Sequence, residues 1–264
     1  MSANKTKADG PETAVKVLLY DLETSPNTVY TWGVYEQNAI KIIRHRQIIA
    51  FAWKWLGDKK TQVKSLRSYP GYKKDRNDNT ALMADLHKLL TEADVVVGHN
   101  SKRFDTRRSH TDFIRKGMAP VPVHKAVDTC EFARAKFDFN SNKLDDLGEF
   151  LGVGRKFKHP GFEMWEGCMA GDNKSWDLME KYNAVDVELL EKIYLKLRPW
   201  MSRHPSLIPI DRAVFACPYC KGTDLAQEGH RYTKAGRNPR YRCKNPQCGK
   251  WSVAQTYKGS LRIQ

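Results

Sequence analysis

The run VKVLLYDLETSP, residues 15–26, limits the possible folds most, because it places two acids in a stretch that otherwise predicts a buried strand. The aliphatic residues before the acids favour a central β-strand, and Thr-Ser-Pro at its end is a stop signal. Side chains alternate across a strand, so Asp21 and Glu23 share one face at a spacing of about 7 Å. At an effective dielectric of about 20 their repulsion is roughly 2 to 3 kcal/mol. A positive charge between the two acids would offset it.

The rest of the pattern predicts a mixed α/β domain. Aromatic and β-branched runs at residues 28–36, 47–57 and 61–69 predict further strands. Helices and strands then alternate. Helices are predicted at residues 81–93, 105–117, 143–153 and 175–200, and strands at residues 94–100 and 123–129. Strands first and alternation afterwards favour a mixed sheet with helices on its faces.

Composition divides the chain into four parts. Residues 1–13 are polar and predict a disordered N-terminus, and residues 14–202 form the main domain. Residues 203–213 contain two prolines and predict a linker, and residues 214–264 form a small C-terminal domain. The start has no apolar core of a signal peptide, and no apolar run is long enough to span a bilayer. We therefore expect a soluble, intracellular, cytoplasmic protein with no membrane association.

The charge balance favours a polyanionic partner. The chain has 45 Lys and Arg against 30 Asp and Glu, a net charge of +15. Between Ala213 and Gln264 there are ten basic and two acidic residues, so +8 of that charge lies in the C-terminal domain. Nucleic acid is the partner expected first. Charge alone leaves two alternatives open, a merely basic surface and an anionic membrane patch.

Three more residues with suitable chemistry lie at the ends of predicted elements. Asp105 in GHNSKRFDTR follows a strand and begins a helix. Tyr182 and Asp186 in YNAVD are four residues apart, which places both on one face of the long helix. Each motif alone is weak, because such acids are more often solvated than catalytic. Their occurrence together with Asp21 and Glu23 changes that balance.

The three motifs resemble those of the DEDD superfamily of 3'-to-5' exonucleases, in the branch that has Tyr in its last motif. DLE matches the first motif, NSKRFD the second and YNAVD the third, in the right order and at fitting separations. DLETSP and GHNSKRFD look similar to proofreading domains of family B DNA polymerases. The resemblance covers residues 15–200. It implies a ribonuclease H-like fold.

The resemblance also implies roles for five residues. Asp21, Glu23, Asp105 and Asp186 would hold two divalent cations, and oxygen ligands favour Mg²⁺ or Mn²⁺. Asp21 would bridge both cations, and Asp186 would hold the one that activates water. Glu23 would contact that cation or the terminal 3'-hydroxyl, and Asp105 would act through water. Tyr182 would orient the attacking water, because a phenol with a pKa of about 10 is a good donor and a poor base.

Several nearby residues are candidates for substrate contacts. They are Thr24, His99 and Asn100 for the terminal nucleotide, and Lys102 and Arg103, with Arg107 and Arg108, for backbone phosphates. For the basic group a solvated helix face is an equal alternative. Asp128 would either support the site or cap the following helix. The segment KFKHPGFEMWEG, residues 156–167, would form a basic, aromatic rim or an ordinary loop.

The C-terminal domain has the cysteine spacing of a zinc ribbon. Cys217 and Cys220 form one knuckle, and Cys243 and Cys248 the other. Four thiolates suit one tetrahedral Zn²⁺, and about fifty residues have too small a core to fold without such a staple. Disulfides are the alternative, disfavoured by the lack of a secretion signal. The second knuckle has four intervening residues instead of two, so His230 is an alternative ligand.

The ribbon's charge predicts binding to nucleic acid that weakens with salt. The expected contacts are its arginines, with tyrosines available to stack on unpaired bases: Arg231, Arg237, Arg240 and Arg242, with Tyr232 and Tyr241. Docking on the main domain and oligomerisation are the alternatives.

Together these patterns predict a 3'-to-5' exonuclease with two Mg²⁺ or Mn²⁺ ions and one structural Zn²⁺. The expected partner is DNA with a free 3' end. An RNA-trimming exonuclease, a structure-specific endonuclease and a non-catalytic nucleic-acid-binding adaptor are the rivals. The presence of all four acids and Tyr182 argues against the adaptor. Strandedness, processivity, pathway, oligomeric state and protein partners are left open by the sequence.

Overall fold

The computed structural model describes residues 15–35, 38–208, 215–233, 236–257 and 260–263. The predicted disordered segment 1–13 lies outside this range, and the predicted linker is described only up to residue 208. The described chain forms two compact units. One spans Lys16–His204, and the other begins at Pro205.

A five-stranded mixed sheet forms the centre of the larger unit, in the order β5-β4-β1-β6-β7. Strand β1 lies in the middle, antiparallel to β4 and parallel to β6, while β7 is parallel to β6 and β5 antiparallel to β4. The strands are β1 (Val17–Thr24), β4 (Ile48–Trp55), β5 (Gln62–Ser65), β6 (Val95–Gly98) and β7 (Lys125–Asp128). The predicted mixed α/β fold is confirmed.

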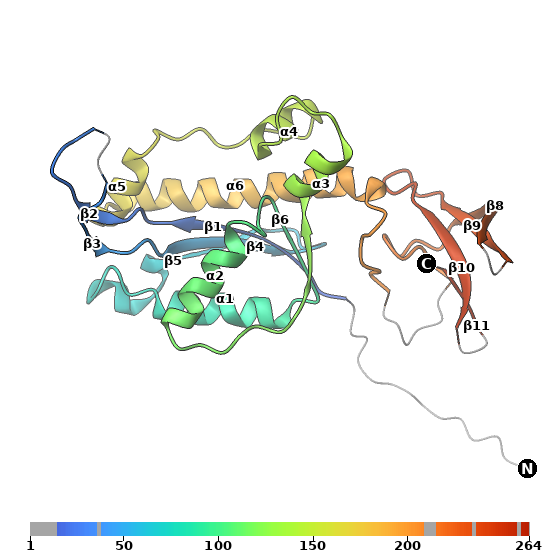
Figure 1. Ribbon diagram of the computed structural model, residues 1–264, viewed down its shortest axis with the longest axis horizontal. Helices are drawn as coiled ribbons and strands as arrows, with labels where there is room; N and C mark the ends of the chain where they lie inside the picture. Colours follow the sequence, from blue (N-terminus) through green and yellow to red (C-terminus); the bar gives the residue numbers. More distant parts are fainter. Residues whose placement is uncertain (1–14, 36–37, 209–214, 234–235, 258–259, 264) are drawn as a thin grey trace, which may run out of the picture. The chain divides into compact units, whose positions relative to one another are not determined.

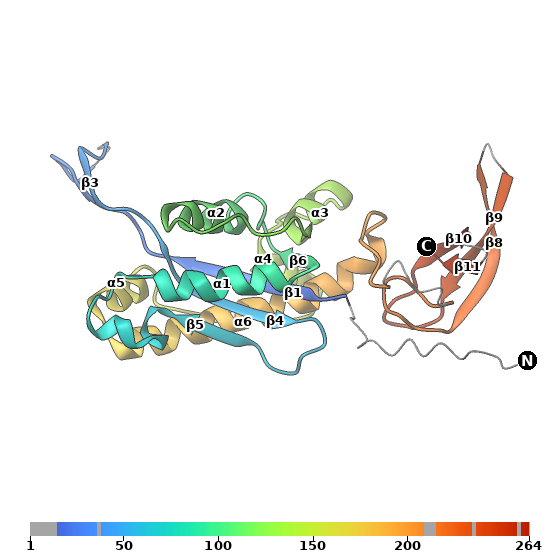
Figure 2. The same ribbon diagram turned by 90° about the horizontal axis from the view of Figure 1, so that it is seen from below.

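Helices cover both faces of this sheet (Figure 1). The long helix α6 crosses one face and contacts β1, β4 and β5, and α3, α4 and α5 pack beside it. Helices α1 and α2 contact β4 from the other face (Figure 2). The α-helices are α1 (Thr80–Glu92), α2 (Asp105–Arg115), α3 (Thr129–Lys136), α4 (Leu144–Phe150), α5 (Glu163–Ala170) and α6 (Asn173–Leu197). Short 3₁₀ turns are η1 (Leu66–Ser68), η2 (Pro70–Lys73) and η3 (Arg198–Trp200).

The main core lies between the sheet and these helices. It includes Leu18 and Tyr20 of β1, Phe51 of β4 and Leu86 of α1. Trp176, on the first turn of α6, is 1 % exposed, and its indole N–H donates to the Tyr72 hydroxyl over 2.8 Å. This packing fixes α6 over β1, which brings the YNAVD motif above DLE.

Two segments differ from the sequence prediction. The sequence predicts a strand at residues 28–36. In the described part, residues 28–35, only β2 (Thr28–Tyr30) is a strand, and it pairs with β3 (Lys41–Arg44) in a separate two-stranded sheet. Bends at residues 32–35 follow the strand, and its side chains are exposed or half-buried, so it offers no buried apolar face to the central sheet. The segment 156–167, predicted to be a rim or loop, includes the start of α5, whose Met164 and Cys168 are buried against the core.

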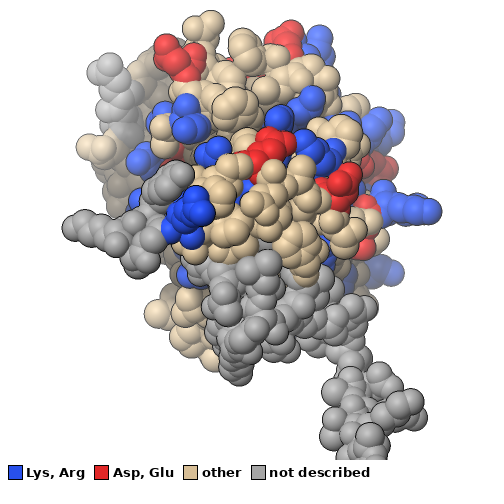
Figure 3. Space-filling view, turned by 90° about the vertical axis from the view of Figure 1, so that its right-hand side faces the viewer, with Lys and Arg blue, Asp and Glu red and all other residues tan. Residues whose placement is uncertain are grey.

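The C-terminal unit is a four-stranded antiparallel sheet in the order β11-β10-β9-β8. Its strands are β8 (Leu225–Thr233), β9 (Gly236–Cys243), β10 (Trp251–Tyr257) and β11 (Ser260–Ile263). Lysine and arginine side chains are spread across the face that Figure 3 shows, rather than gathered in one patch. Within the described ranges, neither unit contains a helix long and apolar enough to cross a membrane.

Candidate active site

Three carboxylates converge where α6 crosses β1. Asp21 and Glu23 lie on one face of β1, as their period-two spacing requires, and Asp186 points to them from α6. One oxygen from each of the three lies within 4.8 Å of the others. Glu23 and Asp186 are buried. The carboxylate oxygens of Asp21 and Glu23 therefore approach more closely than their spacing of about 7 Å along the strand. A third acid, Asp186, joins them.

Asp105 lies in the same cavity but outside this close group. Its Oδ1 atom accepts the backbone N–H of Leu22 over 3.2 Å, so the carboxylate is directed at β1 itself. It begins α2 and is 3 % exposed. The cavity has a volume of about 290 Å³. Its lining is Asp21, Leu22, Glu23, Thr24, His99, Asn100, Phe104, Asp105, Lys156, Trp165, Tyr182 and Asp186.

Lys156 is a site residue that the sequence reasoning did not single out. Its Nζ donates to Asp186 Oδ2 over 2.5 Å and to the Tyr182 hydroxyl over 2.8 Å. Burial alone would lower the pKa of Lys156, but the Asp186 carboxylate raises it above its ordinary value. The lysine therefore places a positive charge beside the acids. The only sequence signal was its place in the basic segment 156–167.

The acids are strongly perturbed. Burial, followed by the charge of Asp186, raises the pKa of Asp21 to about 7. Burial also raises the pKa of Glu23, Asp105 and Asp186, and the Lys156 ammonium opposes the rise at Asp186. Burial therefore makes the charged form of these carboxyls costly, and a bound cation would offset that cost.

Asn183 is a second residue that the sequence reasoning missed. It lies within YNAVD and is fully buried, and its amide donates to Asp21 Oδ2 over 2.8 Å. It lies three residues before Asp186, so both face β1. The hydrogen bond fixes one Asp21 oxygen and leaves the other for the cluster.

Tyr182 borders the acid cluster. Its ring packs edge-on against His159 and Trp165, at centroid distances of 4.7 and 6.3 Å. Burial, followed by the charge of Asp186, raises its pKa to about 12. The phenol therefore keeps its proton at neutral pH. Because Lys156 donates to the Tyr182 oxygen, the phenol proton is directed at other groups, and its hydrogen bond lowers the pKa of Asp186.

The residues present fit a divalent cation. All donors in the close group are carboxylate oxygens, the ligand type that Mg²⁺ and Mn²⁺ prefer. Asp186 Oδ1 is buried and has no hydrogen-bond partner in the described part of the chain. A buried carboxylate oxygen without a partner is costly unless a cation occupies the space before it.

Comparison with protein families identifies the superfamily of the larger unit. The model of the RNase H superfamily matches residues 47–198, more than half of the chain. The chain belongs to the RNase H superfamily. The matched region includes Asp105, Tyr182 and Asp186, and β1 lies before it. Membership in this superfamily supports nuclease activity on nucleic acid with divalent metals.

A solved structure shows the same fold. The family B DNA polymerase from the hyperthermophilic archaeon Pyrobaculum calidifontis matches with a TM-score of 0.52 and 18 % identity. The match covers 70 % of this chain and 25 % of the polymerase chain. No curated protein sequence matches this chain.

Residues beside the second motif hold this part of the site in place instead of offering unbonded groups to a substrate. His99 lines the cavity, yet both ring nitrogens are bonded, to Thr129 Oγ1 and to the Asn142 carbonyl at 2.9 Å each. Burial lowers its pKa. Asp128 caps α3 by accepting the N–H groups of residues 130 and 131, and it also accepts those of Asn100 and Lys102. Both predicted roles of Asp128, cap and support, are therefore seen.

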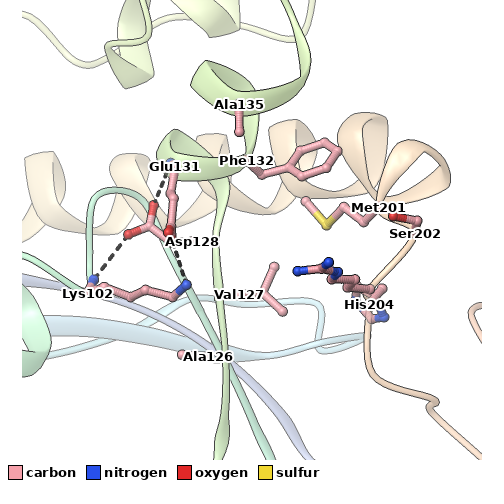
Figure 4. A pocket seen from close by; sticks show the side chains of 11 residues that line it. Lys102, Ala126, Val127, Asp128, Glu131, Phe132, Ala135, Met201, Ser202 and His204 are labelled. Carbon is pink, nitrogen blue, oxygen red and sulfur yellow. Dashed lines mark hydrogen bonds and ion pairs between the residues drawn. The ribbon is translucent and has the colours of Figure 1, made fainter.

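The basic residues near Asp105 divide into separate groups. Lys102 lines a different cavity of about 270 Å³, where its ammonium pairs with Glu131 (Figure 4). Arg108 is half-buried and pairs with the buried Asp112 over 2.5 Å, so its charge is already neutralised. Arg103 is exposed on the loop before α2. Thr24 and Asn100 do line the candidate site, and Asn100 has a φ of 59°.

The four cysteines of the C-terminal unit come together. One Sγ from each lies within 4.8 Å of the others, and the closest pairs, Cys217 with Cys248 and Cys220 with Cys243, are 3.7 and 3.6 Å apart. All four are free thiols. A hydrogen bond from the Cys248 thiol lowers the pKa of Cys217 to about 5, whereas burial raises the pKa of Cys243 to about 11. The cluster is compatible with a zinc ribbon. His230 is not in it.

The predicted ribbon arginines are exposed: Arg231, Arg237, Arg240 and Arg242. Two of them flank an aromatic ring that the sequence reasoning passed over. The guanidinium groups of Arg240 and Arg242 lie 4.4 and 5.9 Å from the ring centroid of Trp251, which is 42 % exposed. The side chain of Tyr232 lies outside the described residues, and Tyr241 is buried.

Proposed function

We propose that this protein is a metal-dependent 3'-to-5' exonuclease that hydrolyses phosphodiester bonds, with DNA as the favoured substrate. The observation that carries the proposal is the convergence of Asp21, Glu23 and Asp186 within 4.8 Å beside Tyr182. The motif resemblance to Tyr-containing DEDD exonucleases and membership in the RNase H superfamily support it.

Asp21, Glu23 and Asp186 would hold the cations directly, and Asp105 would assist through water. When bound, two divalent cations activate water at neutral pH and stabilise the charge of the transition state. Side chains of the protein position the acids and the attacking water. Asn183 holds Asp21, and Lys156 fixes the Tyr182 oxygen so that its hydroxyl proton can orient the attacking water. No covalent intermediate is needed.

Residues at the edge of the cavity support degradation from a 3' end. Thr24 and Asn100 line it beside Glu23. The Asn100 backbone N–H donates to Asp128, and this hydrogen bond holds Asn100 in a fixed position for contact with the substrate. We expect Glu23 and Asn100 to meet the terminal 3'-hydroxyl.

A panel of labelled substrates tests the proposal. Single-stranded DNA, RNA, and mismatched and flapped duplexes, each blocked at one end, are incubated with Mg²⁺ or Mn²⁺. We expect mononucleotides from free 3' ends and resistance of 3'-phosphorylated strands. Rapid cutting of a covalently closed circle would favour an endonuclease instead. Preference for RNA would favour a trimming enzyme.

For the C-terminal unit we propose one Zn²⁺ held by Cys217, Cys220, Cys243 and Cys248, and a role in holding the substrate strand. Trp251 between two arginines supports the second part, because aromatic rings stack on unpaired bases and guanidinium groups bind phosphates. Replacement of Trp251 by Ala should weaken binding of single strands, and elemental analysis should find one zinc per chain.

A further inference from the structure

The β2–β3 hairpin exposes large apolar side chains to solvent. Trp32 is 90 %, Val34 89 % and Tyr35 84 % exposed. Further large side chains of the hairpin are exposed as well: Tyr30, Ile40, Ile42 and Ile43. We call residues 28–35 and 38–44 the aromatic hairpin. Figure 2 shows it projecting away from the central sheet and its helices.

The aromatic hairpin forms a sheet of its own. Strands β2 and β3 pair with each other as a separate two-stranded sheet, and all four residues of β3 are exposed. A hairpin without a third strand or a helix against it is marginally stable in water. Contiguous exposed apolar surface of this kind marks an interaction site.

The hairpin starts at the edge of the candidate active site. Glu23 and Thr24 end β1 and line the cavity, and three residues lead from there to Thr28, a span of at most about 14 Å. Two residues after β3, the Arg46 guanidinium lies 5.6 Å from the ring centroid of Phe104, another cavity residue. The base is held by the Ser25 N–H, which donates to the Gln47 carbonyl over 2.9 Å.

The charges on the hairpin favour a polyanion. Lys41, Arg44 and Arg46 are exposed, and residues 27–46 contain these three basic residues against one acid, Glu36. Two copies of the chain joined through this surface would bring the same cations together. A nucleic acid would instead neutralise them, and its unpaired bases match the exposed rings.

We propose that the aromatic hairpin holds the single strand that enters the carboxylate site, with unpaired bases stacked on Trp32 and Tyr35 and phosphates near Lys41 and Arg44. The inference rests on the proposed function, because its occupant is the substrate of that site. It adds a second contact surface on the main domain, separate from the C-terminal unit.

Binding by the full chain tests this proposal. In an Asp21→Asn background, which prevents hydrolysis, fluorescence anisotropy measures the affinity for labelled single-stranded DNA. We expect Trp32→Ala to weaken binding at least about fivefold, the lower end of one base-stacking contact, and Trp32→Phe to retain most of it. Lys41→Gln with Arg44→Gln should make the slope of log K against log salt shallower by about 0.7 per lost phosphate contact.

Ile114→Ala on α2 is the matched control, because Ile114 is 79 % exposed and outside the hairpin. Equal affinity of the Trp32→Ala, Tyr35→Ala double variant and its parent would overturn the proposal. The proposal would also be overturned if the same double variant sedimented as a monomer, the parent sedimented as a dimer, and both bound DNA equally well. That result would assign the surface to a second copy of the chain. A wild-type protein that binds through the hairpin but hydrolyses no substrate would refute the exonuclease and leave this contact standing.

Discussion

Replacing Lys156 by Met removes the charge that neutralises the acid cluster and nearly preserves side-chain length. Asp186 is 3 % exposed in its side chain and Lys156 31 %. Breaking a fully buried ion pair costs about 3 to 5 kcal/mol, and partial access of water to Lys156 lowers this to roughly 2 to 3 kcal/mol. For a unit of this size that corresponds to a loss of roughly 5 to 10 °C in melting temperature without metal.

Metal should reverse part of this loss. A cation held by Asp186 takes over the charge of Lys156, so Mn²⁺ should stabilise Lys156→Met more than the wild type. The assay is thermal unfolding in EDTA and in excess Mn²⁺ at pH 8. Lys158→Met is the control, since Lys158 is exposed and two residues away.

Turnover should fall as well, because the Tyr182 hydroxyl loses its donor. One charge-assisted hydrogen bond contributes about 1.5 to 3 kcal/mol, so kcat should drop about 10- to 100-fold. Lys156→Arg should keep much of the stability without metal. If Lys156→Met unfolds within 1 °C of the wild type in EDTA, at most roughly a fifth of the expected effect, and gains no extra stability from Mn²⁺, then Lys156 does not neutralise the cluster.

The remaining predictions concern pH, the acids and the C-terminal unit. Folding raises the pKa of Asp21 to about 7, so the metal-free protein should lose stability as pH rises from about 4 through 7; calorimetry of Asp21→Asn should show this loss reduced. Asp186→Asn should abolish hydrolysis while single-strand binding persists, and retained turnover would contradict the metal assignment. A truncation after His204 should still cleave short oligonucleotides and contain no zinc, but should bind long strands more weakly and with a shallower salt slope. Equal binding by both forms would favour docking or oligomerisation of the ribbon.

Much of the larger unit was predictable because its signals are local. The apolar run before Asp21 predicts a buried strand, and regular leucine spacing predicts α1 and α6. Failures occurred where long-range packing outweighs local pattern. Residues 28–36 carry strand-forming side chains, yet among the described residues 28–35 only Thr28–Tyr30 form a strand, and that strand lies outside the central sheet.

The candidate site shows the same division. Motif order was enough to select Asp21, Glu23, Asp105, Tyr182 and Asp186 for one cavity, and all five line it. Lys156 could not be selected, because it comes from a loop with no regular pattern and meets Asp186 only through the packing of that loop against α6. Lys102 was chosen for its closeness to Asp105 in sequence, but its side chain turns to Glu131 instead.

The sequence by itself determined which residues carry chemistry, because a carboxylate, a phenol or a thiolate has its properties before the chain folds. Alternation along β1 also determined that Asp21 and Glu23 share a face. Only the tertiary structure decided the distances among the acids and the lysine that neutralises them, as well as the ring that two ribbon arginines flank. These depend on contacts between segments far apart in the chain, whose geometry is set by the packing of α6 on the sheet and the pairing of β9 with β10.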